Sequence, residues 1–221
     1  MAFTDEIQDD AEAVWDAILE HPMVEQLGEG TLDEEPFRYW LRQDYVYLIE
    51  YSRLFALGAA KAPTLDRMGT MAELLESTIN TELDLHRSYA DSFDVPLAEL
   101  EATTPSPTTR AYTDFLIRTA SMGSFGDIAA VLLPCMWGFN ATGKRLAEQG
   151  KPDHERYAEW IEMYSGAEFT ELTDWCKDLM DDVAADATAA ERERYRELFL
   201  TSARYEYRFW DAAWRQEGWE V

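Results

Sequence analysis

FRYWLRQDYVYLIEYSRLF, residues 37–55, is the stretch that decides the fold class of this chain. Its apolar residues recur three and four positions apart, which is the period of an amphipathic helix and differs from the strict alternation of a half-buried strand. The periodic face also carries a carboxylate, Asp44, which should therefore point inward among aromatic rings. The residues that share this face are Phe37, Trp40, Leu41, Asp44, Tyr47, Leu48, Tyr51 and Phe55.

Helical spacing of the same kind fills the rest of the chain between short clusters of Gly and Pro. Nothing in the composition marks a domain boundary. The prediction is therefore an all-α chain in which residues 1–221 form a single domain, built as a helical bundle. The predicted helices cover roughly 4–20, 33–61, 65–92, 108–122, 125–149, 153–163, 167–184 and 188–217.

Two of the predicted helix starts carry recognisable capping residues. Thr31 or Asp33 can cap the helix that begins there, and Pro36 lies in its first turn, where the missing N–H of proline is tolerated. Thr188, followed three residues later by Glu191, forms a capping box for the last helix.

The charge of the chain is strongly negative. Forty-four Asp and Glu residues oppose 19 Lys and Arg residues, which gives a net charge of −25. Nucleic acid and anionic lipid repel such a polyanion, so neither is expected as a partner. Only four of the basic residues are lysines, and the acidic residues are spread along the chain. We interpret this pattern as adaptation to high internal salt, with a specific acidic function as the alternative.

The sequence also predicts where the protein works. It is 47% apolar, enough for a large core, but it has no apolar stretch of about 18 or more residues that would cross a membrane. The first residues, MAFTDE, lack the basic-then-apolar order of a signal peptide. Two cysteines are too few for a disulfide framework. We therefore expect a cytoplasmic protein with reduced thiols.

Cys135 lies on the apolar stripe of a predicted helix, directly after Pro134. Pro134 cannot donate to the carbonyl of Ala130, so we expect a kink and a freed acceptor beside the thiol. A cysteine on such a face is either inert packing or a reactive thiol, and spacing alone leaves both interpretations open. Cys176 has no comparable setting and is interpreted as packing.

Asp44 and Glu206 are the two carboxylates predicted to lie among aromatic rings. Asp44 is either a structural partner of an inward Arg or Tyr, or a ligand-binding group in a pocket lined by Tyr47 and Tyr51. Glu206 lies within YEYRFW, and surrounding rings should raise the pKa of its carboxyl group towards neutrality. It is either a hydrogen-bonded structural group or a general acid and base.

Glu82 and His86 lie one turn apart on another apolar face, which Ile79 is predicted to share. The simplest interpretation is an internal hydrogen bond between the two side chains. The alternative is a metal pair, although a di-iron bundle needs Glu-x-x-His twice and this chain has Glu-x-x-x-His once. His21 and His154, the other two histidines, fall in predicted loops.

Four segments, in their order and separation, resemble the TenA family of thiaminase II or aminopyrimidine aminohydrolase proteins. The similarity covers nearly the whole chain. No single segment is decisive, but the four together are quite specific. They are RQDYVYL at 42–48, LPCMW at 133–137, YAEWIEMYS at 157–165 with Glu168 and Phe169, and YEYRFW at 205–210.

The resemblance implies a haem-oxygenase-like helical bundle that assembles as a homotetramer and hydrolyses an aminopyrimidine in thiamin salvage, without a cofactor or metal. It implies that Cys135 is the nucleophile, as in the cysteine-containing branch of the family. It further implies that Glu206 moves protons to the leaving group and from the attacking water. Asp44 would hydrogen-bond the amino and ring nitrogens of the pyrimidine.

The resemblance also implies aromatic residues around the substrate. Tyr47, Tyr112 and Tyr164 would supply stacking faces and hydroxyl groups. Phe139, one turn after Cys135, would line the same site, although many family members carry a tyrosine there.

Two other functions are also compatible with the sequence. One is a non-catalytic pyrimidine-binding or regulatory protein, which would have no need of the pair Cys135 and Glu206. The other is a metal-dependent oxidase on the same bundle that uses Glu82 and His86. For an enzyme, the substrate would be thiamin, an aminomethylpyrimidine or a formylated derivative.

Overall fold

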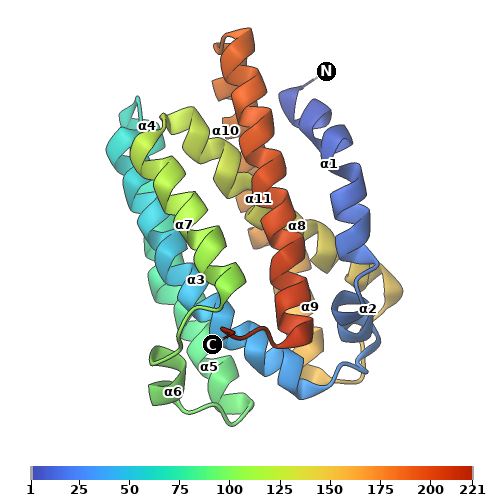
Figure 1. The fold of residues 1–221 in the computed structure, drawn as a ribbon. Coiled ribbons are helices and arrows are strands. Elements are labelled where there is room, and N and C mark those ends of the chain that lie inside the picture. Colours follow the sequence, from blue (N-terminus) through green and yellow to red (C-terminus); the bar gives the residue numbers. More distant parts are fainter. Residues whose placement is uncertain (1, 221) are drawn as a thin grey trace. The chain divides into compact units, whose positions relative to one another are not determined.

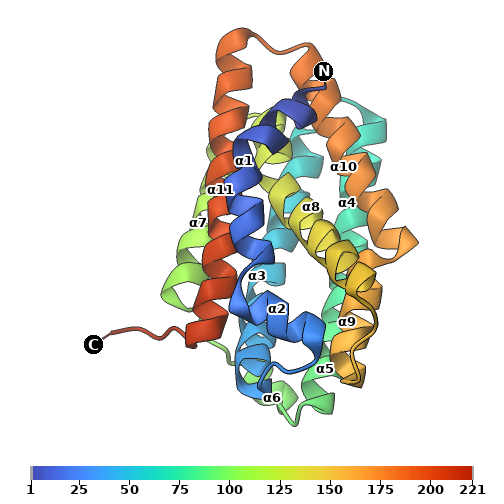
Figure 2. The same ribbon diagram turned by 90° about the vertical axis from the view of Figure 1, so that its right-hand side faces the viewer.

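The computed structural model describes residues 2–220, which are helical almost throughout and contain no β-strand (Figures 1 and 2). The all-α prediction is therefore confirmed for this part of the chain. The elements are α1 (Phe3–Leu19), α2 (Pro22–Glu29), α3 (Glu34–Lys61), α4 (Leu65–Ser77), the π-helical turn η1 (Thr78–Glu82), α5 (Leu83–Ser92), α6 (Leu97–Glu101), α7 (Pro107–Met122), α8 (Phe125–Gln149), α9 (Glu155–Ser165), α10 (Ala167–Ala185) and α11 (Ala189–Arg215).

The sequence prediction missed two short helices, α2 and α6. Each begins at a proline or directly after one, Pro22 and Pro96, at places interpreted as breaks in the helical pattern. Proline interrupts the interior of a helix but is tolerated in its first turn, because its fixed φ angle is helical. A proline in the sequence can therefore mark either the end of one helix or the start of the next. The capping box of Thr188 and Glu191 is confirmed, because Glu191 Oε2 accepts from the Thr188 backbone N–H at 2.8 Å.

The helices divide into two compact units. The first unit contains the chain up to Leu32 together with Ala129–Asp211, and the second contains Asp33–Ile128 and the chain from Ala212 onward. The prediction of one domain over residues 1–221 stays a prediction. Within residues 2–220, no helix combines the length and the apolar character needed to cross a membrane.

Helix α3 forms the centre of the second unit. All eight residues of the face predicted from the sequence are buried, including Asp44. The ring of Phe37 packs 4.9 Å from that of Phe93, just beyond α5. Gly58 lets α4 approach, since a Cβ atom there would lie 3.0 Å from Met71 Sδ. Burial of each large ring stabilises the fold by about 1.5–3 kcal/mol, so this face dominates the core of the unit.

The π-helical turn η1 changes which face of the following helix is buried. Before it, α4 buries Met71 and Leu74. An uninterrupted α-helix would continue this face through Leu85, but one extra residue in the turn moves it on by one position. His86 is accordingly buried, while Leu85 is only half-buried. The same shift makes the predicted burial of Ile79 wrong, because Ile79 is exposed.

The chain beyond α11 packs against other parts of the second unit. Glu217 Oε2 accepts from the backbone N–H of Thr108 at 2.8 Å, in the first turn of α7, where a negative charge suits the helix dipole. The Glu217 carbonyl accepts from the Tyr39 hydroxyl at 2.7 Å. Trp219 Nε1 donates to the Pro105 carbonyl at 2.9 Å. Helix α11 thus ends at Arg215, two residues earlier than predicted.

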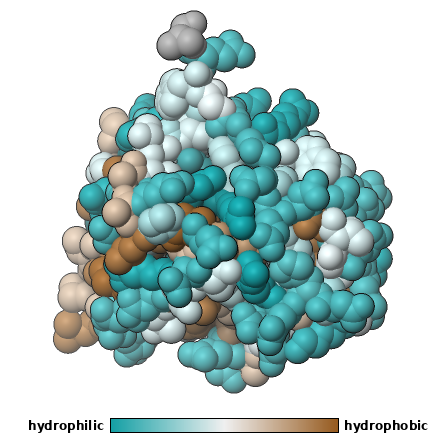
Figure 3. All heavy atoms as spheres, turned by 90° about the horizontal axis from the view of Figure 1, so that it is seen from below, coloured by the Kyte–Doolittle hydropathy of each residue, from teal (hydrophilic) through white to brown (hydrophobic). Residues whose placement is uncertain are grey.

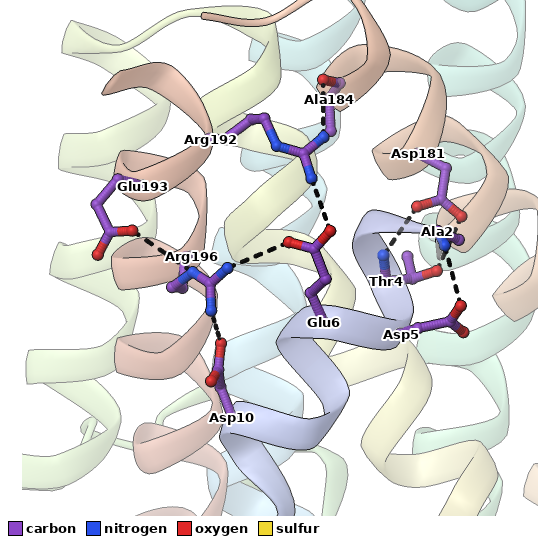
Figure 4. Close-up of polar contacts among 10 residues, drawn as sticks. All are labelled: Ala2, Thr4, Asp5, Glu6, Asp10, Asp181, Ala184, Arg192, Glu193 and Arg196. Carbon is purple, nitrogen blue, oxygen red and sulfur yellow. Dashed lines mark hydrogen bonds and ion pairs between the residues drawn. The ribbon is translucent and has the colours of Figure 1, made fainter. Parts of the chain in front are cut away.

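In the first unit, arginines of α11 bind carboxylates of α1 (Figure 4). Arg192 donates to Glu6 at 3.0 Å, and Arg196 donates to both Glu6 and Asp10. From the other side, Asp181 of α10 accepts from the backbone N–H and the hydroxyl of Thr4, each at 2.8 Å. Scarce positive charges are therefore placed where two helices bring carboxylates together.

The end of α9 is fixed against α8 at very close range. Asn140 Nδ2 donates to the carbonyl of Tyr164 at 2.8 Å and to Thr170 Oγ1 at 3.0 Å. One turn further along α8, Gly143 faces the same backbone, and a Cβ atom there would lie 2.8 Å from Ser165 N and from Tyr164 C. Only glycine permits this approach, because backbone atoms cannot move aside as a side chain can.

We therefore expect Gly143→Ala to destabilise the protein by about 1–3 kcal/mol, the range for overpacking a well-packed contact. Gly69→Ala is the matched control, since Gly69 is also helical but a Cβ atom there meets nothing within 4 Å. That control should gain about 0.5–1 kcal/mol from helix propensity. Urea unfolding of both variants measures the difference, and equal stabilities would contradict the close contact.

Candidate functional site

In the second unit, Asp44 is buried beside a cluster of tyrosines. Tyr47 lies one turn further along α3, with its ring 5.3 Å from that of Tyr51. The ring of Tyr112, from α7, lies 5.1 Å from Tyr47. The structure therefore brings together Tyr47 and Tyr112, which the resemblance implied for the site, and adds Tyr51 as the sequence periodicity predicted. Stacked rings beside a carboxylate suit a flat heterocycle that carries N–H donors.

Asp44 is paired with a histidine. His86 Nε2 lies 2.6 Å from Asp44 Oδ2, and His86 is 1% exposed and Asp44 3% exposed. The expected structural partner of Asp44 was an Arg or a Tyr, and this was wrong. The expected hydrogen bond between the side chains of Glu82 and His86 was wrong too, because His86 Nδ1 contacts the backbone carbonyl of Glu82, at 2.9 Å. Spacing along one helix predicts which face is apolar, but it carries no information about the partner that another helix supplies, here Asp44 of α3.

The two contacts of His86 determine where its protons lie. A backbone carbonyl only accepts, so Nδ1 carries a hydrogen. A single further proton then lies between Nε2 and Asp44. Burial alone would lower the pKa of His86, but the hydrogen bond to Asp44 and the negative charges of Asp44 and Glu82 raise the pKa above its ordinary value. The raised pKa favours the protonated form of the His86 ring opposite Asp44.

Glu82 contributes a third titratable group in this part of the unit. Loss of solvation raises its pKa from 4.5 to about 7, with His86 lowering the pKa and Asp44 raising it. A carboxyl group with this pKa changes charge near neutrality. In the folded protein it holds its proton over a pH range in which the unfolded chain has already lost it.

Glu82 makes the free energy of unfolding depend on pH. The raised pKa of Glu82 adds stability below the unfolded value of about 4.5, and this stability is lost as the pH rises through about 7. Glu82→Gln stays neutral and avoids the loss. Because Glu82 is half-buried as a residue, we expect a gain of only about 1–2 kcal/mol at pH 8 and none at pH 4. Urea unfolding at both pH values checks this, and a gain of equal size at both would contradict it.

The predicted metal pair finds no support in this geometry. Both ring nitrogens of His86 already have partners, Asp44 and the Glu82 carbonyl. Across residues 2–220, no group of three or more His, Cys, Asp or Glu side chains is arranged to hold a metal ion. His21 caps α2 through Nδ1, which accepts from Met23 N, and His154 stacks on Tyr157 at 3.7 Å, so both serve local structure.

In the first unit, contacts on either side of Cys135 and Glu206 define how α8 and α11 face each other. One turn before the pair, Ser202 Oγ donates to the carbonyl of Val131 at 2.8 Å. One turn after it, the rings of Phe139 and Trp210 lie 5.5 Å apart. Residues four apart share a helix face. Cys135 and Glu206 are therefore at the same level on the facing sides of the two helices, and both are buried.

Hydroxyl groups from neighbouring helices hold the backbone of α8 around the thiol. Ser202 binds the Val131 carbonyl, and Thr173 Oγ1 of α10 donates to the carbonyl of Met136 at 3.2 Å. Ser202 is fully buried and Thr173 is 1% exposed. Helix α8 continues through Pro134. The kink expected at Pro134 stays a prediction.

Phe139 and Tyr164, both implied for the site, are brought together by the packing of α9 on α8. Their rings lie 4.9 Å apart. Trp160 contributes a third ring, 6.0 Å from Phe139 and 4.6 Å from Tyr164. With Trp210, these rings form an aromatic surface one turn beyond the thiol, fixed by the contacts of Asn140 and Gly143.

The second cysteine differs from the first in its surroundings. Cys176, in α10, is fully buried, and loss of solvation raises the pKa of its thiol to about 12. A thiolate is the reactive form, so Cys176 is inert at neutral pH. The prediction that Cys176 only packs agrees with this. Cys135 is 9% exposed.

The predicted site residues fall into two groups. Asp44, Tyr47 and Tyr112 belong to the second unit. The first unit holds the other four, which are Cys135, Phe139, Tyr164 and Glu206. That the two groups surround one substrate stays a prediction.

The sequence analysis did not find three of the residues that support these groups, His86 as the partner of Asp44, Ser202 and Thr173. A signal for the first exists in Thr78-Ile79-Asn80-Thr81, a run of residues that favour helices weakly and that coincides with η1.

Comparison with known proteins gives one consistent result. A family model described as the TENA/THI-4/PQQC family matches residues 8–216. An aminopyrimidine aminohydrolase of Halalkalibacterium halodurans is 40% identical over 220 residues, covering 99% of this chain and 98% of that protein.

Solved structures agree with the family match. A TenA homologue protein from P. horikoshii OT3 superposes with a TM-score of 0.91 at 29% identity, covering 97% of this chain and 99% of the other. A domain from Shewanella denitrificans OS217 with a heme oxygenase-like fold superposes with a TM-score of 0.78 over 96% of this chain and 92% of the other, at 11% identity, which bears on the fold alone. The predicted haem-oxygenase-like helical fold is confirmed.

Proposed function

We propose a function for this chain from one premise, that it belongs to the TENA/THI-4/PQQC family, as the sequence segments indicated. The function is hydrolysis of an aminopyrimidine, a C–N cleavage that releases a hydroxymethylpyrimidine for thiamin salvage. The relative from Halalkalibacterium halodurans, 40% identical along nearly its whole length, is named for this activity. A substrate with an aminomethyl group and thiamin itself are the two candidates.

The observation that carries this proposal is the alignment of α8 and α11 by the contacts of Ser202 with Val131 and of Phe139 with Trp210, which lie one turn before and one turn after Cys135 and Glu206. A thiol is a strong nucleophile only when it loses its proton to a nearby base. A carboxylate on the facing helix is such a base, and it can return the proton to a leaving amine. Ser202 and Thr173 keep the backbone on which the thiol is mounted in place. A protein that only binds pyrimidines has no need of this arrangement.

The chemical steps follow from these roles. Glu206 takes the proton of the Cys135 thiol, and Sγ forms a bond to a carbon of the pyrimidine ring or to its methylene carbon. The C–N bond breaks, and Glu206 gives its proton to the departing amine. Water then adds its oxygen to the methylene carbon as the C–S bond breaks, and Glu206 takes the released proton and returns it to the Cys135 thiolate. The sum is aminomethylpyrimidine plus water giving hydroxymethylpyrimidine plus ammonia.

The tyrosines and Asp44 bind the pyrimidine in this proposal. Tyr47 and Tyr112 supply ring faces for stacking, and the Asp44 carboxylate accepts hydrogen bonds from the amino group. Phe139 and Tyr164 line the thiol side. Phenylalanine at 139 offers no hydroxyl, so orientation at this end depends on Tyr164.

Cys135→Ser should abolish hydrolysis while leaving binding of the hydroxymethylpyrimidine product within about twofold, because a serine hydroxyl is far less acidic than a thiol. Turnover is measured by product release from aminomethylpyrimidine and from thiamin, and binding by calorimetry. Cys176→Ser is the matched control and should retain full activity. Turnover retained in Cys135→Ser would remove the thiol from the mechanism. Product binding by a wild type that hydrolyses neither substrate would favour a non-catalytic binder.

We extend the proposal to the assembly and the setting of the protein, a cytoplasmic homotetramer, as the family resemblance implies. Leu65 and Met122, at the ends of α4 and α7, are 84% and 77% exposed, and apolar side chains of this kind suit contact with a second copy. Sedimentation analysis of the wild type tests the tetramer.

Adaptation to concentrated salt completes the proposal. The net charge of −25 opposes folding through self-repulsion, and Figure 3 shows one face of the molecule covered largely by hydrophilic residues. Because salt of about 1 M shortens the screening distance to about 3 Å, the melting temperature should rise steeply between dilute buffer and molar potassium chloride. Calorimetric melting over this range tests it, and full stability in dilute buffer would refute the adaptation.

A further inference from the structure

His86 is a buried histidine to which the proposed reaction gives no role. It is 1% exposed and lies in the core of the second unit beneath the ring of Trp40, at 5.8 Å between ring centroids. Burying an imidazolium and a carboxylate together is costly compared with apolar side chains of the same size. A pair that stability alone does not favour calls for another explanation.

The π-helical turn η1 directly precedes α5 and places His86 next to Asp44. Without its extra residue, Leu85 would occupy the buried position, and an apolar side chain would meet the carboxylate. The turn therefore exchanges a leucine for a histidine at this one place. Such turns are rare and occur frequently at functional sites.

The contact with His86 also determines what Asp44 can bind. It occupies one oxygen, Oδ2, and fixes the plane of the carboxylate. A ligand would then be bound through the other oxygen, Oδ1. In its carboxylate form, Asp44 only accepts hydrogen bonds. It therefore favours a heterocycle whose facing edge presents an amino group and disfavours one that presents a carbonyl oxygen.

We propose that His86 is a positioning residue that holds Asp44 as an oriented carboxylate, and that this pair selects amino-substituted over oxo-substituted pyrimidines. The inference rests on the proposed function, since it takes the pyrimidine as the ligand of Asp44. Tyr47, Tyr51 and Tyr112 stack on the ring without regard to its substituents, so the choice between amino and oxo groups depends on the pair.

A double-mutant cycle tests whether His86 acts through Asp44. Calorimetry measures the Kd of 4-amino-5-hydroxymethyl-2-methylpyrimidine and of its 4-oxo analogue for wild type, His86→Gln, Asp44→Asn and the double variant. His86→Gln should weaken binding of the amino compound about tenfold, as expected for loss of one well-oriented hydrogen bond to a charged group. The preference over the oxo compound should fall by a similar factor.

The cycle and the kinetics separate positioning from general damage. In the Asp44→Asn background, His86→Gln should change the Kd by less than about twofold. With the aminomethylpyrimidine substrate, His86→Gln should raise KM and leave kcat within about threefold, because the thiol chemistry is untouched. His154→Gln, at a histidine of the first unit, is the matched control and should match the wild type in all these measurements.

A measurement on the wild type keeps the test decisive if His86→Gln fails to fold. The chain has only three histidines. Nitrogen-15 spectra of the histidine rings, assigned by comparison with His21→Gln and His154→Gln, should show both nitrogens of His86 protonated at pH 7.5. A neutral His86 ring would overturn the proposal.

The remaining outcomes are also decisive. An unchanged Kd and preference in a folded His86→Gln variant would overturn the role of His86 while leaving the proposed function intact. So would equal losses in the two backgrounds of the cycle. A wild type that neither binds nor hydrolyses either pyrimidine would overturn both proposals at once.

Discussion

The carboxylate of Asp44, buried among aromatic rings, is the constraint on which the arrangement of the second unit depends. A lone charge in such a place would be strongly destabilising, so a partner must come from another helix. His86 is that partner, and it reaches Asp44 only because η1 inserts one residue before α5. The carbonyl of Glu82 then fixes the remaining nitrogen. The contact between Asp44 and His86 thus accounts for the position of α5 against α3 and for the irregular turn η1 between α4 and α5.

The first unit solves a related problem with neutral groups. Helix α8 carries a proline in its middle and a thiol directly after it, and hydroxyls from two other helices bind the backbone carbonyls on either side. The contacts of Ser202 with Val131 and of Trp210 with Phe139 fix the level of α11 against α8. The alignment of Cys135 with Glu206 is therefore a result of packing one turn away from both.

Periodicity predicted the helices and the buried face of α3 because both follow from spacing along one element. It also predicted the burial of Asp44, Cys135 and Glu206 for the same reason. The partner of Asp44 was missed because spacing placed His86 on an apolar face of its own helix but carries no information about which side chain of α3 it meets. The level of α8 against α11 depends on contacts between helices, about which spacing within each helix carries no information. The roles of the residues came from the family resemblance.

The burial of Cys176 has a practical consequence. Because its thiol is fully buried and holds its proton far above neutrality, Cys176 does not compete with Cys135 for electrophiles. A fluorophore, a spin label or a covalent inhibitor that modifies a thiol of this chain would therefore modify Cys135 rather than Cys176. The intact mass of the treated protein would then count occupied sites directly, with one adduct per chain marking a fully titrated preparation.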